Sequence, residues 1–131
     1  TDSTNSEAFT DFNKLHFVHS IANTDYISRL PITVAASTNY HLKIKFDSDR
    51  KMSIYVNGEQ YGLANTAGTT FDGGTTTVTG TTQATIDNRS QKSAAMTNDI
   101  DLIPYIGIEA GDGAAAALDV QYEAISRLIF E

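Results

Sequence analysis

The stretch from Tyr40 to Leu63 limits the possible folds more than any other part of this 131-residue chain. Over residues 40–46 an apolar residue stands at every second position, with histidine or lysine between. This alternation is typical of a strand that has one face against a core and the other face in water. Residues 47–50 are polar and predict a turn, because Asp and Ser side chains bond nearby backbone N–H groups.

A second and a third strand follow directly. Residues 52–56 alternate again, and Asn57-Gly58 supplies two residues that tolerate the positive φ angles of a tight hairpin turn. Residues 59–63 then return as the third strand. The sequence therefore predicts a three-stranded antiparallel meander over residues 40–63.

Shorter strand patterns lie on both sides of this meander. Leu15, Phe17 and Ile21 share one parity, and Pro31 is expected to break the chain before a further short strand. About eight short strands separated by turns are typical of a β-sandwich or jelly roll. The expected strands outside the meander are residues 14–21, 32–34, 103–108 and 118–130, the last with a register change near Ala124.

Two polar segments complete the expected organisation. Residues 1–13 are predicted to form an extended N-terminal arm, and residues 14–131 a single all-β, antiparallel β-sandwich domain. A Thr/Gly-rich insertion at residues 64–101 interrupts that domain. We expect it to be a long exposed loop or hairpin, or else an arm that adds a strand to a neighbouring subunit. Because the chain begins with Thr1, it is expected to be a processed product or an excerpt.

Composition excludes several function classes. The chain has no cysteine, which excludes disulfides, thiolate metal sites and thiol nucleophiles. Its net charge of -7 argues against nucleic acid as a partner, because phosphate binding needs clustered Lys and Arg. No apolar run approaches the roughly 18 residues of a membrane span, and the polar start shows no signal peptide. We therefore expect neither a nucleic-acid nor a membrane partner.

No motif in the chain predicts catalysis. The Gly111-x-Gly113-x-x-Ala116 pattern resembles a dinucleotide-binding turn, but too little chain follows it for the βαβ unit that such a turn requires. There is no G-x-S-x-G sequence. Three glutamates lie on different expected elements, so no facing pair for glycan cleavage is assigned; they are Glu59, Glu109 and Glu123. We predict no catalytic and no cofactor-binding residue.

No complete set of metal ligands is recognisable in the sequence, and one tyrosine is a candidate for sugar binding. His16, His19 and His41 do not share a face at a ligand spacing, and we interpret them as ordinary surface or interface residues. The pairs Asp47/Asp49 and Asp99/Asp101 leave calcium open, although neither pair brings the six or more oxygens that calcium prefers. Most tyrosines fall within strand patterns. Tyr26, which is expected in a loop, is the one candidate for ligand binding through its ring.

Two segments carry a resemblance that covers about half the chain. Residues 40–47 and 52–59, with Tyr-Val-Asn-Gly at 55–58, resemble the central hairpin of concanavalin A-like (laminin G-type) jelly rolls. Residues 101–110 and 118–127 look like structural proteins of tailed bacteriophage particles that carry such a domain. The Thr-rich insertion is not part of this pattern. The resemblance transfers no sugar or calcium ligands.

This resemblance implies a non-enzymatic structural protein on the surface of a virion. The first expectation is a capsid decoration or cement protein that binds the major capsid protein or other virion proteins through arms and sheet edges. Such a subunit is expected to form a homo-oligomer. The alternative is a carbohydrate-binding, host-attachment module of a phage tail or a secreted protein. A glycan-cleaving enzyme is the third and least favoured reading.

Overall fold

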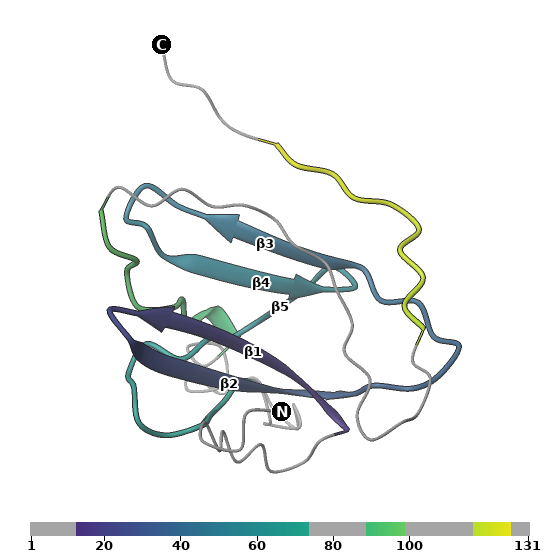
Figure 1. Ribbon diagram of the computed structural model, residues 1–131, viewed down its shortest axis with the longest axis horizontal. Helices are drawn as coiled ribbons and strands as arrows, with labels where there is room; N and C mark the ends of the chain where they lie inside the picture. The colour runs from purple at the N-terminus through teal and green to yellow at the C-terminus, as the bar shows by residue number, and fades with distance from the viewer. Residues whose placement is uncertain (1–12, 74–88, 99–116, 127–131) are drawn as a thin grey trace. The chain divides into compact units, whose positions relative to one another are not determined.

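The computed structural model describes residues 13–73, 89–98 and 117–126. The chain divides into two compact units, one made of Ala8–Ile100 and the other of Thr1–Glu7 with Asp101–Glu131. Among the described residues of the first unit, six strands form two three-stranded sheets, so the architecture is all-β, as predicted (Figure 1). Residues 1–12 of the expected arm and the expected strand at 103–108 lie outside the described residues.

The predicted meander is confirmed as one of the two sheets. Its strands are β3 (Leu42–Phe46), β4 (Met52–Val56) and β5 (Glu59–Tyr61), antiparallel and in that order. At the hairpin between β4 and β5, Asn57 and Gly58 have φ angles of 50° and 85°. These are the positive values that a two-residue turn of this hand requires, so the Asn-Gly pair fixes the register of the hairpin.

The other sheet is built on a hairpin near the start of the described chain. Strand β1 (Lys14–Ile21) pairs antiparallel with β2 (Thr24–Thr33), and β2 pairs in parallel with the short β6 (Phe71–Asp72). Ala22 and Asn23 connect β1 to β2 with φ angles of 50° and 60°. This turn has the same hand as the Asn-Gly turn, although its first residue is an alanine.

The prediction that Pro31 breaks the chain before a separate strand at residues 32–34 is wrong. Strand β2 runs through Pro31 to Thr33. Between β1 and β2 the register shifts from Lys14 opposite Thr33 to His16 opposite Arg29. Pro31 lies within this irregularity, where the ladder of hydrogen bonds is already interrupted and a missing N–H breaks no pair.

The hydrophobic core takes side chains from both sheets. Leu30 of β2 is fully buried together with the inward-facing residues of β4, and Leu63 follows β5 into the same cluster. An all-β unit with its core between two sheets is sandwich-like. The buried cluster consists of Leu30, Met52, Ile54, Val56, Tyr61 and Leu63, with Leu15, Phe17, Ile32, Tyr40 and Met96 packed against it.

The described parts of the insertion are not uniformly exposed: residues 65–70 are mostly exposed, whereas other parts pack against the sheets. Residues 71–72 form β6, and Ser93 is almost completely buried. The hydroxyl of Ser93 accepts a hydrogen bond of 2.8 Å from the Met52 amide, and the Ser93 amide donates to the Met52 carbonyl at 3.1 Å. Serine is small enough to be buried here with its hydroxyl satisfied, so this polar segment packs beside β4.

The expected last strand is not formed by the residues that the structure describes there. Residues 117–126 belong to neither sheet, and their side chains are exposed (yellow in Figure 1). Alternation alone does not make a strand, because the backbone groups need a neighbouring strand to bond. Residues 127–130 lie outside the described part. Within the described ranges, no helix has the length and hydropathy to span a membrane.

Candidate functional site

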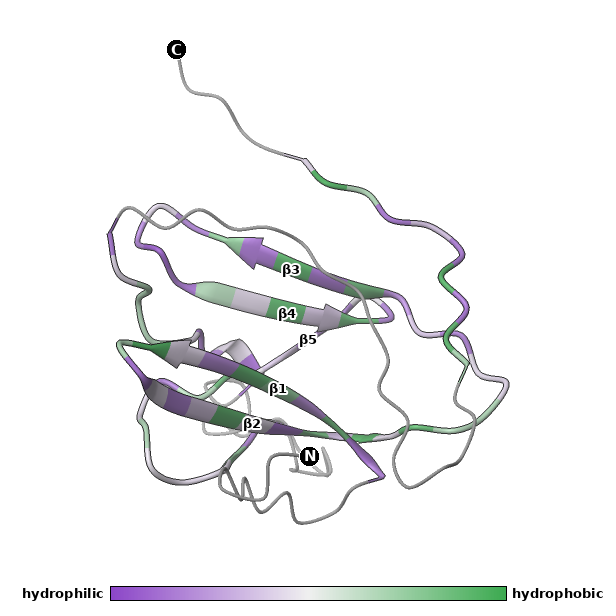
Figure 2. Cartoon of the chain, viewed as in Figure 1, coloured by the Kyte–Doolittle hydropathy of each residue, from purple (hydrophilic) through white to green (hydrophobic). Residues whose placement is uncertain are grey.

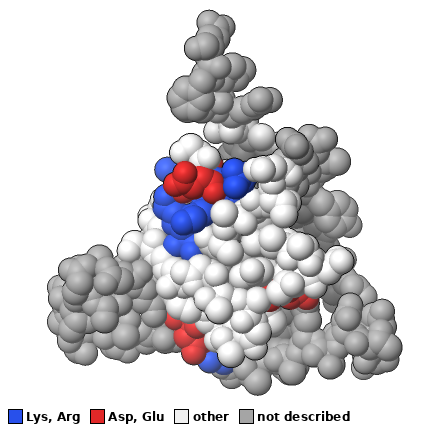
Figure 3. All heavy atoms as spheres, turned by 90° about the vertical axis from the view of Figure 1, so that its left-hand side faces the viewer, with Lys and Arg blue, Asp and Glu red and all other residues white. Residues whose placement is uncertain are grey.

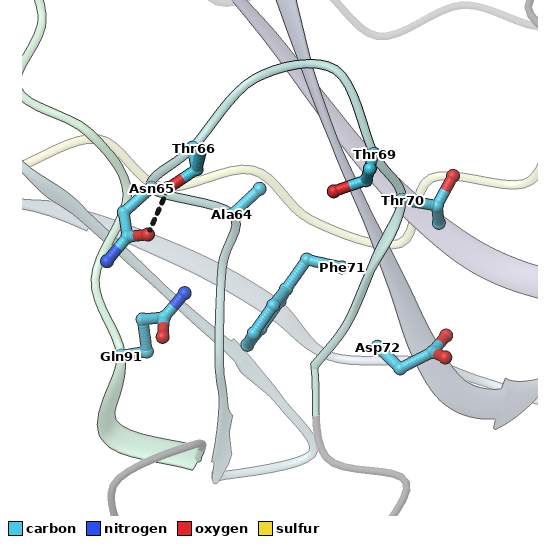
Figure 4. Close-up of a pocket in the computed structure, with 8 residues that line it drawn as sticks. All are labelled: Ala64, Asn65, Thr66, Thr69, Thr70, Phe71, Asp72 and Gln91. Atoms are coloured by element: carbon cyan, nitrogen blue, oxygen red, sulfur yellow. Dashed lines mark hydrogen bonds between the residues drawn. The ribbon is translucent and has the colours of Figure 1, made fainter.

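An open pocket of about 380 Å³ lies beside β6 (Figure 4). The connection from β5 to β6 forms most of its wall, and Gln91 enters from the returning segment. Hydroxyl and amide side chains dominate the lining, with one aromatic ring and one carboxylate. The lining residues are Ala64, Asn65, Thr66, Thr69, Thr70, Phe71, Asp72 and Gln91.

Hydrogen bonds hold the two amides of this pocket. The side-chain Nε2 group of Gln91 donates to the backbone carbonyl of Leu63 at 2.8 Å. The backbone amide of Leu63 in turn donates to the backbone carbonyl of Gln91 at 2.9 Å. Asn65 accepts from the Thr66 hydroxyl at 3.2 Å. The other polar atoms of the two amide groups form no hydrogen bond with the described residues. Each amide therefore keeps bonding capacity for a ligand.

The carboxylate of Asp72 is already paired. Arg29 on β2 donates to its two oxygens at 2.6 and 3.0 Å, and the two residues lie opposite each other in the β2–β6 register. A bidentate guanidinium–carboxylate pair is strong and geometrically fixed. The ion pair with Arg29 therefore fixes the position of Asp72 in the pocket wall. The ring of Phe71 lies between Ala64 and Asp72 in Figure 4.

A second hollow of about 670 Å³ shares Asn65, Thr66 and Gln91 with the first. Charged side chains gather near the turn between β3 and β4, where Figure 3 shows basic and acidic residues in contact. Lys92 donates to Asp47 at 2.6 Å. This hydrogen bond, together with those from the turn backbone, holds the pKa of Asp47 below its ordinary value, and Asp47 raises the pKa of Lys92.

These contacts bear on the calcium prediction. The Oδ1 atom of Asp47 accepts from the amides of Asp49 and Lys51, each at 2.9 Å, and its Oδ2 atom accepts from Lys92. The carboxylate therefore closes the turn, as the polar sequence predicted. In the three described ranges no group of three or more candidate metal ligands occurs. The second pair, Asp99 and Asp101, lies outside the described residues.

Tyr26, the predicted ligand-binding residue, does not lie in a loop. It belongs to β2, and its ring stacks on His19 with centroids 4.9 Å apart and planes 18° apart. It does not line either pocket. Its role in binding a ligand stays a prediction.

The histidines were interpreted as surface or interface residues, and His19 is not a surface residue of the single chain. His41 is exposed and His16 half-buried, but His19 is only 7% exposed. Neither ring nitrogen of His19 has a hydrogen-bond partner among the described residues, and burial lowers its pKa from 6.5. Parity contained the signal: His19 shares the inward face with Leu15, Phe17 and Ile21.

This burial predicts a loss of stability in mild acid. Because burial lowers the pKa of His19 in the folded chain, the unfolded chain protonates His19 to a greater extent below pH 6.5 and therefore binds more protons. The free energy of unfolding should therefore fall as the pH drops from 7 to 5, by at most about 1.4 kcal/mol per pH unit. Urea titrations of the native chain and of His19→Phe test this. The variant should lose part of the slope, whereas His41→Gln should keep it; equal slopes for the native chain and His19→Phe would contradict the argument.

Sequence reasoning did not find the pocket at all. Its lining comes from the polar stretch 64–72 and from Gln91, which were expected to be exposed. The available signal was chemical, because this stretch combines hydroxyl and amide residues with a single Phe. Comparisons with protein-family models, curated proteins and solved structures gave no match.

Proposed function

We propose that this chain is a non-enzymatic structural protein of a bacteriophage particle, in the first place a capsid decoration or cement subunit on the virion surface. The proposed fold is a concanavalin A-like jelly roll. The sandwich-like, all-β unit fits this fold, and the resemblance of residues 101–110 and 118–127 to phage structural proteins supports the virion assignment. The partners would be the major capsid protein or other virion proteins, and further copies of this chain.

The half-exposed inner face of β3 carries this proposal. Leu42, Ile44 and Phe46 are 53, 51 and 45% exposed, although their register partners on β4 are buried. Figure 2 shows this alternation of apolar and polar residues along β3. Rows of exposed large apolar residues mark interaction surfaces. If the subunit assembles with neighbours, a neighbour would cover these three apolar side chains, which the core of the single chain buries only in part.

The test is binding to the particle. Light scattering gives the solution mass of the purified chain, and sedimentation with particles stripped of it measures the bound amount. We expect saturable binding with a fixed number of copies per particle, because a regular lattice offers equivalent sites. A chain that does not bind stripped particles at any concentration would contradict the role in the capsid.

The pocket beside β6 favours a second candidate, a carbohydrate-binding host-attachment module. Amides and hydroxyls suit hydrogen bonds to sugar hydroxyls, and an aromatic ring suits the apolar face of a sugar. A glycan screen separates the two candidates. A chain that ignores the particle but binds a glycan, and loses that binding on Gln91→Ala, would favour this second function.

A further inference from the structure

Strand β3 lies at the edge of its sheet. It bonds β4 on one side, and no described strand bonds its other side. An open edge of this kind pairs readily with an extended segment, which continues the sheet. The half-exposed row of Leu42, Ile44 and Phe46 lies along the same strand, so a segment added there would also cover apolar surface.

The polar face of β3 limits which segment fits. Lys43 and Lys45 alternate with the apolar row, and both are exposed. The ammonium group of Lys45 is held 5.2 Å from the centre of the Tyr55 ring on β4. If β3 of another copy paired with this edge, lysines would face lysines, which is unfavourable. The favoured occupant therefore alternates apolar residues with acidic ones.

Residues 118–123 of this chain have that pattern. Leu118, Val120 and Tyr122 are 50, 47 and 66% exposed, and they alternate with Asp119, Gln121 and Glu123. Placing the apolar residues beside those of β3 puts the acidic residues beside its lysines. Both properties of the β3 edge are thus matched by one segment.

We infer that residues 118–123 of one copy pair with the β3 edge of a second copy. This inference rests on the proposed function and identifies the neighbour at β3 as another copy of the chain. Because the proposed function is that of a subunit that assembles with its neighbours, the matching segment is assigned to a second molecule. Each copy offers one β3 edge and one segment 118–123. Two copies can therefore exchange segments in a dimer, or several copies can pass each segment to the next copy in a closed ring.

Charge reversal in two separate variants tests this pairing. Lys43→Glu/Lys45→Glu makes the edge acidic, and Asp119→Lys/Glu123→Lys makes the segment basic. The substituted residues are exposed charges, so both variants are expected to fold. Sedimentation equilibrium should show each variant self-associating at least about tenfold more weakly than the native chain, because like charges then face each other.

The mixture of the two variants is the decisive measurement. An acidic edge fits a basic segment and the native edge fits the native segment, so an equimolar mixture should form a one-to-one complex with the native affinity. Both variants keep a net negative charge, so bulk attraction does not produce this result. A native chain that stays monomeric, or a mixture that stays dissociated, would overturn the inference.

This outcome is separable from the test of the particle role. Restored association in the mixture without binding to stripped particles would contradict the proposed function alone. Binding to particles by a native chain that stays monomeric would contradict the strand exchange alone.

Discussion

Gly73→Ala is expected to lower the free energy of unfolding by about 3 kcal/mol. A Cβ atom on Gly73 would lie 2.1 Å from the carbonyl oxygen of Gly62 and 3.3 Å from a Leu30 methyl group. The first contact is with backbone, so no side-chain rotation relieves it. The Gly73 amide also donates to the Arg29 carbonyl at 2.9 Å, which holds this residue in place beside β2. Chemical denaturation followed by far-UV circular dichroism measures the loss.

Gly68→Ala is the matched control. Gly68 has a φ angle of +94°, and nothing lies within 4 Å of a Cβ atom built there. This substitution carries only a conformational cost, about 1 kcal/mol. Equal losses for the two variants would contradict the assignment of the Gly73 effect to the close approach of the chain near Gly62.

The meander was predictable because its signals are local. The strand patterns of β3 and β4 and the Asn57-Gly58 turn act over a few residues, and the structure confirms the two strands and the turn. The apolar face of β3, which was expected to lie against a core, is instead about half exposed. The turn after β3 was also predictable, since Asp47 bonds amides within four residues of itself. Local patterns of this kind need no knowledge of the rest of the fold.

Features that depend on distant partners were not predictable in the same way. Pro31 fits within β2 because β1 has an irregular register opposite it, and nothing near Pro31 in the sequence reveals this. Ser93 looks like a loop residue until Met52 is placed beside it. The pocket likewise brings Gln91 to the Asn65 region through its bonds to Leu63. Such contacts are set by tertiary pairing, which composition does not encode.

Leu63→Ala is expected to lower the free energy of unfolding by about 3 kcal/mol. The Leu63 side chain is fully buried in the cluster between the sheets. Its backbone is bonded through both its amide and its carbonyl to Gln91. Because these bonds fix the backbone, the surroundings relax little around the shortened side chain. The lost apolar burial then adds to the cost of a cavity.

Leu42→Ala removes the same atoms from an exposed position and serves as the control. Leu42 is 53% exposed on β3, so its loss should cost less than about 1 kcal/mol. Since Leu42 also belongs to the proposed contact between copies, both substitutions are best made in the Lys43→Glu/Lys45→Glu background, where association is weakened. In that background, the difference between the two losses in free energy of unfolding measures the contribution of core burial at Leu63 without a contribution from association. A Leu42→Ala loss as large as that of Leu63→Ala would mean that the inner face of β3 is covered within one molecule, and it would contradict the strand exchange as well.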